Sequence, residues 1–481
     1  MIDGVPSAFL DALRRSVGPS HVLAQGDLAA WEHDWRQRSR GKALAVVRPC
    51  STQEVAAVVK ACLQHRVPLV CQGGNTGLVD GSIPDASGRE LVLSLQRMNR
   101  IRAIDPLNAT ITVDAGCVLQ VVQEAAAAQS MLFPLSLGSQ GTCTIGGNLA
   151  TNAGGTQVVR YGNARELCLG LEVVTPDGDV WDCLSGLRKD NTGYDLRNLF
   201  IGSEGTLGVI TAATLKLHPQ PRSTVTAWLA FPSLDAAVGV LQQARADLSS
   251  GLTAFEVMGR SALALVERHR PQVRIPLGDG APCFALIEKS DHEPQDRARD
   301  AVEQLLEAAL DRGLIVDAVI ADTLDQARGM WNVREALALV QALEGVHVKH
   351  DISLPISAIR DFCAETDKQL IRAFPGCRLV NFGHMGDGNL HYNVHSPEGS
   401  HAAAFVRTHE RAINAIVYGQ VKKHQGSISA EHGIGHLKVG ELPQYKPAAA
   451  LKLMGSIKAA IDPMGLFNPG RVLSKAPSNE H

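Results

Sequence analysis

Four glycine-rich segments lie in the first half of the chain, and they constrain its fold more than any other feature. They are residues 72–78, 137–148, 152–155 and 201–210. Glycine reaches positive φ and lets backbone N–H groups approach a ligand closely, and successive N–H groups in such turns form concave anion sites. None of these segments contains Arg or Lys. Neutral donors would therefore hold an anion there, which suits the buried diphosphate of a large cofactor.

A single segment of this kind is more often a plain turn than a ligand site, so the prediction depends on four of them together. No GxGxxG follows an expected strand, and no GxxxxGK[ST] is present, so Rossmann and P-loop folds lack their main support. We expect strands at residues 44–49, 68–71, 91–95 and 110–113. We expect helices at 8–17, at 52–65 with Ser51 or Thr52 as the N-cap, and at 118–129.

The residue pattern of the sequence changes at His218-Pro219-Gln220-Pro221, where two prolines disfavour both helix and strand. Beyond it we expect strands at 224–231, 283–288, 315–321, 379–382 and 390–394, and helices at 234–247, 295–312, 331–343, 402–424 and 447–461. That order favours an open sheet with helices packed on one side, an α+β layer. We place one domain at 1–219 with its core at 43–219, a second at 222–460, and a C-terminal segment at 461–481.

Size and composition allow two or three domains with real cores, because the chain has 481 residues of which 45% are hydrophobic and 20% charged. A net charge of -3 gives no reason to expect nucleic acid as a partner. Ten scattered cysteines without a CxxC pair indicate free thiols. The start, Met1-Ile2-Asp3-Gly4, has no basic region or long apolar run, so we expect a cytoplasmic protein, with peripheral attachment to a membrane as an option.

A second group of residues whose side chains can take part in chemistry lies near the C-terminus. His384 and His391 flank a turn that contains Gly386 and Gly388, and Glu431 and His432 follow forty residues later. Two histidines and a glutamate form a common three-ligand set for a catalytic divalent metal with open positions, and His432 is left to move a proton. A lone histidine is more often a packed side chain, and these residues alone also fit a metal-dependent hydrolase.

The glycine-rich segments, in their order and in their residues, resemble the FAD-binding domain of the PCMH-type (vanillyl-alcohol oxidase) superfamily. The resemblance implies an α+β fold and these FAD contacts: Gly73, Gly74, Asn75, Thr76, Gly77, Leu78, Ser139, Gly141, Thr142, Gly146, Gly147, Asn152, Gly154, Glu204, Gly205, Gly208, Ile210 and Asn468. Some relatives carry a flavin-linking histidine where this chain has Asn75, which implies non-covalent FAD. Asp80 stands where relatives often have glycine, a small departure.

The segments around His384 and Glu431, with Trp331–Glu335 and Lys349–Pro355, resemble the D-2-hydroxy-acid dehydrogenases of the FAD-oxidase type 4 family. The resemblance runs from about residue 43 to 473 and returns Phe467–Leu473 to the glycine-rich half. It implies that His384, His391 and Glu431 bind zinc, although such ligands also suit manganese, iron or cobalt. It also implies that His432 is the base and that Arg334, Lys349 and Asn393 bind the substrate.

The same resemblance implies oxidation of a D-2-hydroxy acid to the 2-oxo acid. Asn393 favours D-2-hydroxyglutarate, with D-lactate or D-malate as the alternative. Hydroxyglutarate oxidisers often have Thr or Ser four residues after the arginine, where this chain has Ala338. An electron-transfer flavoprotein or a quinone would reoxidise the flavin, and a homodimer is compatible with the sequence. A metal-dependent hydrolase and a flavin-binding protein without catalysis remain as rivals.

Overall fold

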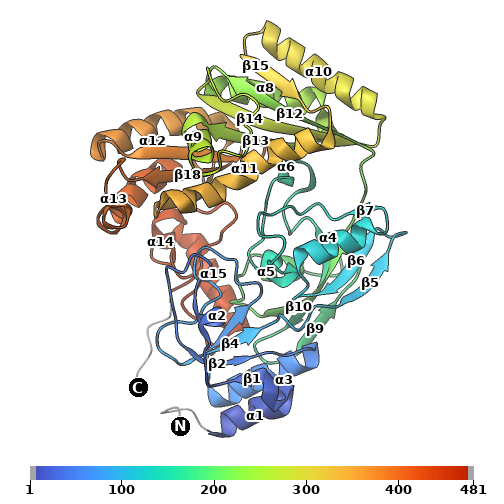
Figure 1. Ribbon diagram of the computed structural model, residues 1–481. Coiled ribbons are helices and arrows are strands. Elements are labelled where there is room, and N and C mark those ends of the chain that lie inside the picture. Colours follow the sequence, from blue (N-terminus) through green and yellow to red (C-terminus); the bar gives the residue numbers. More distant parts are fainter. Residues whose placement is uncertain (1–6, 475–481) are drawn as a thin grey trace. The chain divides into compact units, whose positions relative to one another are not determined.

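The computed structural model describes residues 7–474 and divides them into two compact units (Figure 1). Unit 1 contains the described residues of Met1–Gly154, Asn163–Pro219 and Glu431–His481, and unit 2 contains Gly155–Gly162 and Gln220–Ala430. The break between them in the middle of the chain comes at Pro219, inside the proline-rich stretch. Unit 1 is therefore built from both ends of the described chain, and unit 2 is mostly one continuous insertion.

Unit 1 contains two main sheets. The first has four strands in the order β1-β2-β4-β3, with β4 parallel to β2 and β3, and the second has five antiparallel strands in the order β5-β6-β10-β8-β9. The strands are β1 (Val22–Leu23), β2 (Ala43–Val47), β3 (Leu69–Gln72), β4 (Glu90–Ser94), β5 (Ile101–Asp105), β6 (Thr110–Asp114), β7 (Met131–Leu132), β8 (Cys168–Val174), β9 (Val180–Cys183), β10 (Val209–Lys216) and β11 (His218–Pro219).

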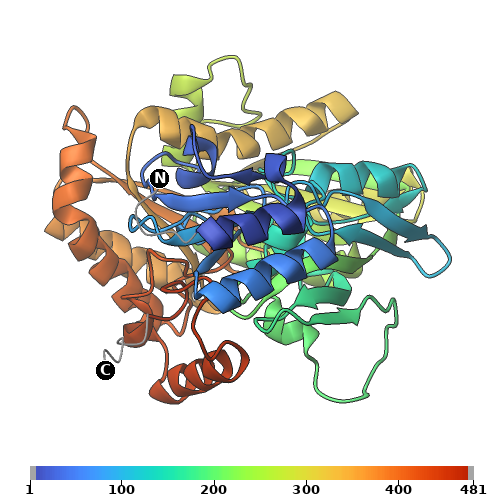
Figure 2. The same ribbon diagram turned by 90° about the horizontal axis from the view of Figure 1, so that it is seen from below.

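The helices of unit 1 are mostly short. They are α1 (Ser7–Val17), α2 (Ala29–Glu32), α3 (Thr52–His65), α4 (Leu119–Ala127), α5 (Ile145–Ala150), α7 (Arg197–Phe200), α14 (Leu442–Tyr445) and α15 (Ala448–Ile461). Ser51 caps α3, because its hydroxyl accepts a hydrogen bond from the N–H of Glu54 at 3.2 Å. Figure 2 shows α1 and α3 side by side, and Phe9 and Leu13 of α1 are fully buried. The expected helices at 8–17 and 52–65 are confirmed.

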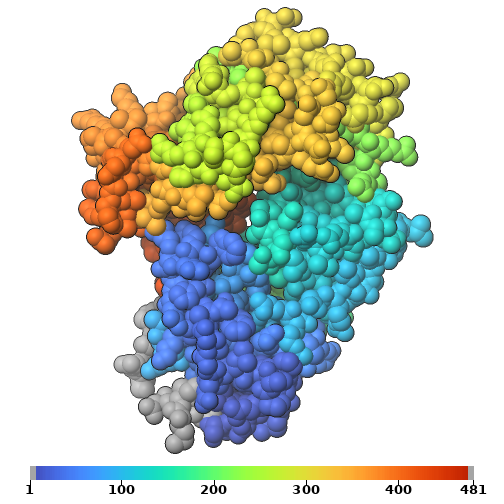
Figure 3. All heavy atoms as spheres, viewed as in Figure 1, coloured from blue at the N-terminus to red at the C-terminus, as the bar shows by residue number. Residues whose placement is uncertain are grey.

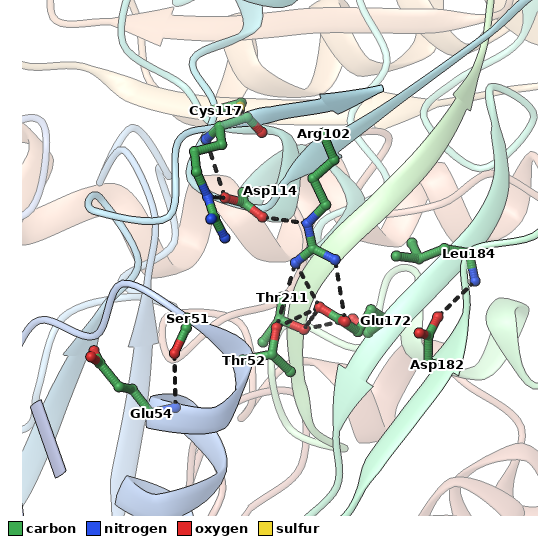
Figure 4. Close-up of polar contacts among 11 residues, drawn as sticks. Ser51, Thr52, Glu54, Arg102, Asp114, Cys117, Glu172, Asp182, Leu184 and Thr211 are labelled. Carbon is green, nitrogen blue, oxygen red and sulfur yellow. Dashed lines mark hydrogen bonds and ion pairs between the residues drawn. The ribbon is translucent and has the colours of Figure 1, made fainter. Parts of the chain in front are cut away.

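A buried polar cluster joins several of these elements (Figure 4). Arg102 of β5 donates from Nε to Asp114 at 2.6 Å and from Nη2 to Glu172 of β8 at 2.9 Å. Glu172 also accepts the hydroxyl of Thr211 in β10 at 2.8 Å. Burial alone would raise the pKa of Glu172, but Arg102 and the hydroxyl donors lower it. The carboxylate therefore stays ionised and ties β8 to β5 and β10 of the five-stranded sheet.

The C-terminal segment closes unit 1. The Asn468 Oδ1 atom accepts the N–H of Cys71 at 3.0 Å, and its Nδ2 donates to the carbonyl of Glu204 at 2.6 Å. Arg471 forms a buried ion pair with Glu90 at 2.8 Å. The expectation that Phe467–Leu473 returns to the glycine-rich half is therefore met by these contacts. The ten cysteines are all free thiols, as predicted.

Unit 2 is built on one seven-stranded antiparallel sheet in the order β15-β12-β14-β13-β17-β18-β16. Its elements are α6 (Val158–Tyr161), β12 (Ser223–Phe231), α8 (Leu234–Asp247), β13 (Leu252–Gly259), α9 (Arg260–His269), β14 (Cys283–Asp291), α10 (Gln295–Asp311), β15 (Asp317–Ile320), α11 (Leu324–Glu344), β16 (Val348–Ser353), α12 (Ile359–Ala373), β17 (Arg378–His384), β18 (Asn389–His395) and α13 (Ala402–Lys423). A capping box of Thr323 and Gln326 begins α11.

Helices cover both faces of this sheet, so the expectation of helices on one side is wrong. Trp228, Met258 and Phe284 pack on one face in a core that includes residues of α9 and α11, and Figure 3 shows the atoms of these two helices in yellow-green and gold. The neighbouring residues Ala227, Val257 and Ala285 point to the other face and are also buried, beside α8 and α10. A strand that is buried on both faces has a continuous apolar sequence instead of an alternating one. The sequence pattern therefore does not reveal the second layer of helices.

Candidate active site

The β17–β18 hairpin carries the two histidines singled out by the sequence. Its register pairs Phe382 with His391 and His384 with Asn389, and side chains alternate between faces along each strand. His384, His391 and Asn393 therefore lie on one face, the face covered by α11 (Leu324–Glu344). Gly388 adopts a φ of +86°, and a Cβ on Gly386 would come within 3.1 Å of Val159. The turn thus requires glycine at 388, and a side chain at 386 would press against Val159.

The two imidazoles lie edge to face, with ring centroids 5.3 Å apart and planes inclined by 81°. Both side chains are largely buried, with 8% and 14% of their surface exposed. The hairpin thus brings the two rings next to each other. Two adjacent imidazoles on one sheet face could supply two ligands to a divalent metal.

Asp351 was missed by the sequence analysis as a possible member of this group. It lies opposite His391 on β16, and its Oδ1 atom is 3.9 Å from the Nδ1 of His391. It also accepts hydrogen bonds from Asn389 at 2.9 Å and from the N–H of Ala430 at 3.1 Å. Asp351 is only 2% exposed, so it could orient His391 or offer a carboxylate oxygen to a cation.

Glu256 of β13 was also missed. The sheet register places it opposite His384, and its Oε1 atom accepts the Nδ1–H of that histidine at 2.8 Å. Its Oε2 atom accepts the Nε–H of Arg334 at 2.7 Å. No sequence pattern indicated this role, because Glu256 stands alone in an apolar strand and its partners are far along the chain.

Arg334 projects from α11 and stacks over the ring of Phe382, with its guanidinium carbon 4.8 Å from the ring centroid. Its side chain is 9% exposed. Within residues 7–474, its Nη2 atom is buried without a hydrogen-bond partner. A buried donor of this kind needs an acceptor, and a substrate carboxylate would supply one.

Burial alone would raise the pKa of Glu256, but the positive charges of His384 and Arg334 and their hydrogen bonds lower it. The carboxylate is therefore ionised beside both partners. Burial raises the pKa of Asp387, in the hairpin turn, to about 6 despite the attraction of His384.

Lys349 and Asn393 are cross-strand partners on β16 and β18. The register places both on the α11 face, and Asn393 donates from Nδ2 to the Oε1 of Gln341 in α11 at 2.8 Å. Lys349 is half-buried and Asn393 fully buried. The three residues expected to bind substrate, Arg334, Lys349 and Asn393, thus share one layer of unit 2 with the two histidines.

Glu431 and His432 belong to unit 1 and follow Ala430 directly in the chain. The Oε1 of Glu431 lies 3.8 Å from the Nε2 of His432. The next residues are anchored by Glu204, whose two carboxylate oxygens accept the N–H groups of Ile434 and Gly435 at 2.8 and 2.7 Å. Burial raises the pKa of Glu204, although both backbone N–H groups oppose that shift. Glu204 therefore fixes the loop that carries the expected base.

The first glycine-rich loop, residues 73–78, presents unused backbone donors. Among the residues that the structure describes, the N–H groups of this loop form no hydrogen bond with protein. A Cβ on Gly73 would lie 2.3 Å from the Thr144 hydroxyl, and one on Gly74 would lie 2.2 Å from the Thr142 carbonyl. The loop is thus pressed against residues 142–144, and its row of free donors fits the diphosphate of FAD.

The remaining residues expected at the cofactor divide into two groups. Ser139, Gly141 and Thr142 lie at a partly or fully exposed loop, whereas Gly146, Gly154, Gly205, Gly208 and Ile210 are buried. The side chains of Asn75, Asn152, Glu204 and Asn468 bond to protein atoms. These four side chains shape their loops, and any contribution to FAD would come through the backbone around them.

The fold defines the class of protein. The structure matches a crystal structure of p-cresol methylhydroxylase with a TM-score of 0.76 and 17% sequence identity, covering 98% of each chain. This is the fold of the PCMH-type flavoproteins, as the sequence predicted.

The sequence comparisons then give the family. An FAD binding domain matches residues 43–184, and the C-terminal domain of FAD linked oxidases matches residues 220–472. The chain is 38% identical over 474 residues to the mitochondrial D-2-hydroxyglutarate dehydrogenase of Bos taurus, covering 95% of this chain and 85% of the relative. It is 37% identical over 478 residues to a Schizosaccharomyces pombe protein provisionally named mitochondrial D-lactate dehydrogenase, covering 97% and 88%. The chain belongs to the FAD-linked oxidase family.

The expectation of a cytoplasmic protein, with or without peripheral membrane attachment, is wrong by this comparison, because both relatives are named mitochondrial. That expectation depended on what the first residues lack, and such a lack does not fix a compartment. Met1–Gly4 also lie outside the described residues. Among residues 7–474, no helix has the length and apolar character needed to cross a membrane.

Proposed function

We propose that this protein is an FAD-dependent dehydrogenase that oxidises a D-2-hydroxy acid, in the first place D-2-hydroxyglutarate, to the 2-oxo acid. The observation that carries the proposal is the unpaired Nη2 of Arg334, buried on the same sheet face as His384, His391, Lys349 and Asn393. The positively charged guanidinium of Arg334, beside two imidazoles, can bind a carboxylate of the substrate through a charge-assisted hydrogen bond. The relatives named as 2-hydroxy-acid dehydrogenases support the same activity.

We propose that a divalent metal, zinc in the first place, is held by His384, His391 and Glu431. The two imidazoles share one face of unit 2, and Glu431 directly follows Ala430, whose N–H bonds to Asp351 beside His391. The donors present, imidazole and carboxylate, are those that zinc, manganese, iron and cobalt accept. When bound, FAD supplies a two-electron acceptor and the metal supplies Lewis acidity toward the hydroxyl.

The chain's own residues bind the acid and move its proton. Arg334 and Lys349 hold the carboxylates and Asn393 adds an amide contact, which fixes the acid in one orientation. His432 accepts the hydroxyl proton of the acid on its Nε2 atom, which lies beside Glu431.

FAD is held non-covalently, because the first glycine-rich loop has Asn75 and no histidine. The amide of Asn75 bonds to His33 and Ser82. An electron-transfer flavoprotein or a quinone then reoxidises the flavin.

D-lactate is the second candidate substrate, and one residue favours it. Ala338 lies one helical turn after Arg334 on α11, where the family resemblance leads us to expect Thr or Ser in an oxidiser of hydroxyglutarate. A charge-assisted hydrogen bond contributes about 1.5–3 kcal/mol, so its loss weakens the preference for a dicarboxylic acid.

The test is anaerobic flavin bleaching with a panel of D- and L-2-hydroxy acids. We expect the yellow holoenzyme to bleach with D-2-hydroxyglutarate faster than with D-malate or D-lactate, and to stay yellow with the L-isomers. Bleaching by D-lactate alone would assign the second substrate. A colourless protein, or a flavin that no 2-hydroxy acid reduces, would contradict the dehydrogenase and leave the hydrolase or the flavin-binding protein.

A further inference from the structure

Glu256 contacts two residues that the proposed function places at the substrate. It lies on β13, between the strand that carries His384 and the helix that carries Arg334. Its side chain is 1% exposed, and each of its two oxygens accepts one hydrogen bond, from His384 Nδ1 and from Arg334 Nε. A carboxylate has only acceptors to offer, and both partners meet it with donors.

The bond to His384 fixes which ring nitrogen can bind a cation. Nδ1 carries the proton that Glu256 accepts, so Nε2, once deprotonated, is the ring nitrogen that can bind a cation. A carboxylate in this position also makes the imidazole more basic and holds its plane. The sheet register, which places Glu256 directly opposite His384, sets this contact independently of any ligand.

The bond to Arg334 fixes the other side of the site. Glu256 takes the Nε–H and Phe382 supports the guanidinium plane, so the unpaired Nη2 is held in one direction. One carboxylate therefore orients both a candidate metal ligand and a candidate substrate-binding group. We infer that Glu256 is the positioning residue that couples metal binding at His384 to carboxylate binding at Arg334, an inference that rests on the proposed function.

A neighbouring glutamate shows that burial alone does not explain the arrangement. Glu288 of β14 is also buried and also contacts α11, but its partners are the neutral donors Trp331 Nε1 at 2.8 Å and Thr226 Oγ1 at 3.3 Å. It touches neither His384 nor Arg334. Glu288 is therefore a matched control for a buried carboxylate of the same sheet.

The test is Glu256→Gln, because an amide has one acceptor oxygen and can serve only one of the two donors. Zinc affinity of chelator-stripped holoenzyme would be measured by competition with a chromophoric chelator, alongside KM, kcat and flavin content. We expect zinc binding to weaken about 10–100-fold and KM for the hydroxy acid to rise about tenfold or more. Flavin content should be unchanged, and Glu288→Gln should match the wild-type protein in zinc affinity and KM.

Unchanged zinc affinity and KM in folded Glu256→Gln would overturn the inference while the proposed function stands. Wild-type protein that binds no zinc, or binds it equally well after His384→Gln, would overturn both. If Glu256→Gln does not fold, long-range 1H–15N spectra of histidine-labelled wild-type protein with zinc answer the same question. His384 should coordinate through Nε2 with Nδ1 protonated, and coordination through Nδ1 would overturn the inference.

Discussion

Side chains at this site are held by contacts of different kinds. His432 lies in a loop whose following residues are fixed by Glu204, and its Nε2 is 3.8 Å from the carboxylate of Glu431. Arg334 is held by a buried ion pair and an aromatic ring. His432, the proposed base, thus depends on the backbone around it, whereas Arg334, the proposed substrate-binding residue, depends on side chains.

His432→Asn should leave FAD bound and slow flavin reduction about 10²–10⁴-fold, because the amide cannot accept the hydroxyl proton. Stopped-flow absorbance of the flavin under anaerobic conditions measures the rate. His436→Asn is the control, since that exposed histidine lies nearby in the same segment. Among the described residues, its ring bonds only to the backbone carbonyl of Gly470. A near-normal reduction rate in His432→Asn would refute its role as the base.

Single residues also show where the sequence stopped being informative. His384, His391, Arg334, Lys349 and Asn393 were predicted because they stand in distinctive local segments. The structure places four of them on one face of one sheet, and Arg334 on α11, the helix that covers this face. Glu256 stands alone in an apolar strand, and no local pattern ties Asp351 to His391. Their positions become meaningful only through strand register, which pairs Glu256 with His384 and Asp351 with His391 and is not encoded in any short segment.

Helices and strands were predicted well where caps and periodicity agreed. α3 and α8 have the bounds expected from the sequence, and Ser51 and Ser233 are their N-caps. β13, the strand of Glu256, was missed because it lies between a short 3-10 turn and a helix without a clear turn signal. The order of strands in the seven-stranded sheet was also out of reach, because its pairing is decided by long-range packing rather than by local preference.

The C-terminal end of α11 carries a charged network that links three elements of unit 2. Glu344, its last residue, accepts hydrogen bonds from Arg378 of β17, from Arg268 of α9 at 3.1 Å and from His269 at 2.6 Å. Burial alone would raise the pKa of Glu344, but these donors and the charges of Arg378 and Arg268 lower it to about 2. The network offsets the unfavourable placement of a carboxylate at a helix C-terminus.

Because the pKa of Glu344 is lower in the folded than in the unfolded protein, its stabilisation is complete above the ordinary value of 4.5 and is lost as the pH falls toward 2. Glu344→Gln should reduce the free energy of unfolding by about 1–2 kcal/mol at pH 6, allowing for solvent screening. Urea denaturation at a series of pH values measures the difference, which should shrink below pH 4.5. A difference that stays constant across this range would show that the charge of Glu344 contributes nothing.

For the whole molecule, FAD binding and stability should be linked. Any ligand that binds only the folded state stabilises it, and the stabilisation grows with the logarithm of the ligand concentration once that concentration exceeds Kd. Unit 1 offers the row of free N–H groups at residues 73–78, which have no protein acceptor among the described residues. Unit 1 should therefore be the part of the protein whose stability responds to flavin.

Gly74→Ala should reduce FAD content at least tenfold and lower the melting temperature, because a Cβ there would meet the Thr142 carbonyl at 2.2 Å and displace the loop. The ratio of flavin to protein absorbance and thermal denaturation with added FAD measure the two effects. Gly138→Ala is the control, since a Cβ at that position has no atom within 4 Å. Full flavin content in Gly74→Ala would show that the packing of this loop does not matter for the cofactor.

The attachment of Asn468 and Arg471 to β3, β4 and the Glu204 turn has a consequence for how the protein is made. Domains generally fold as units while synthesis proceeds from the N-terminus. Here the first strands to leave the ribosome receive their last partners from the final part of the described chain. Unit 2 is complete at residue 430 apart from the short piece 155–162, which has by then already emerged. The insertion can therefore finish folding before all segments of unit 1 have been made, and β3, β4 and the Glu204 turn lack these contacts until residues 468–471 follow.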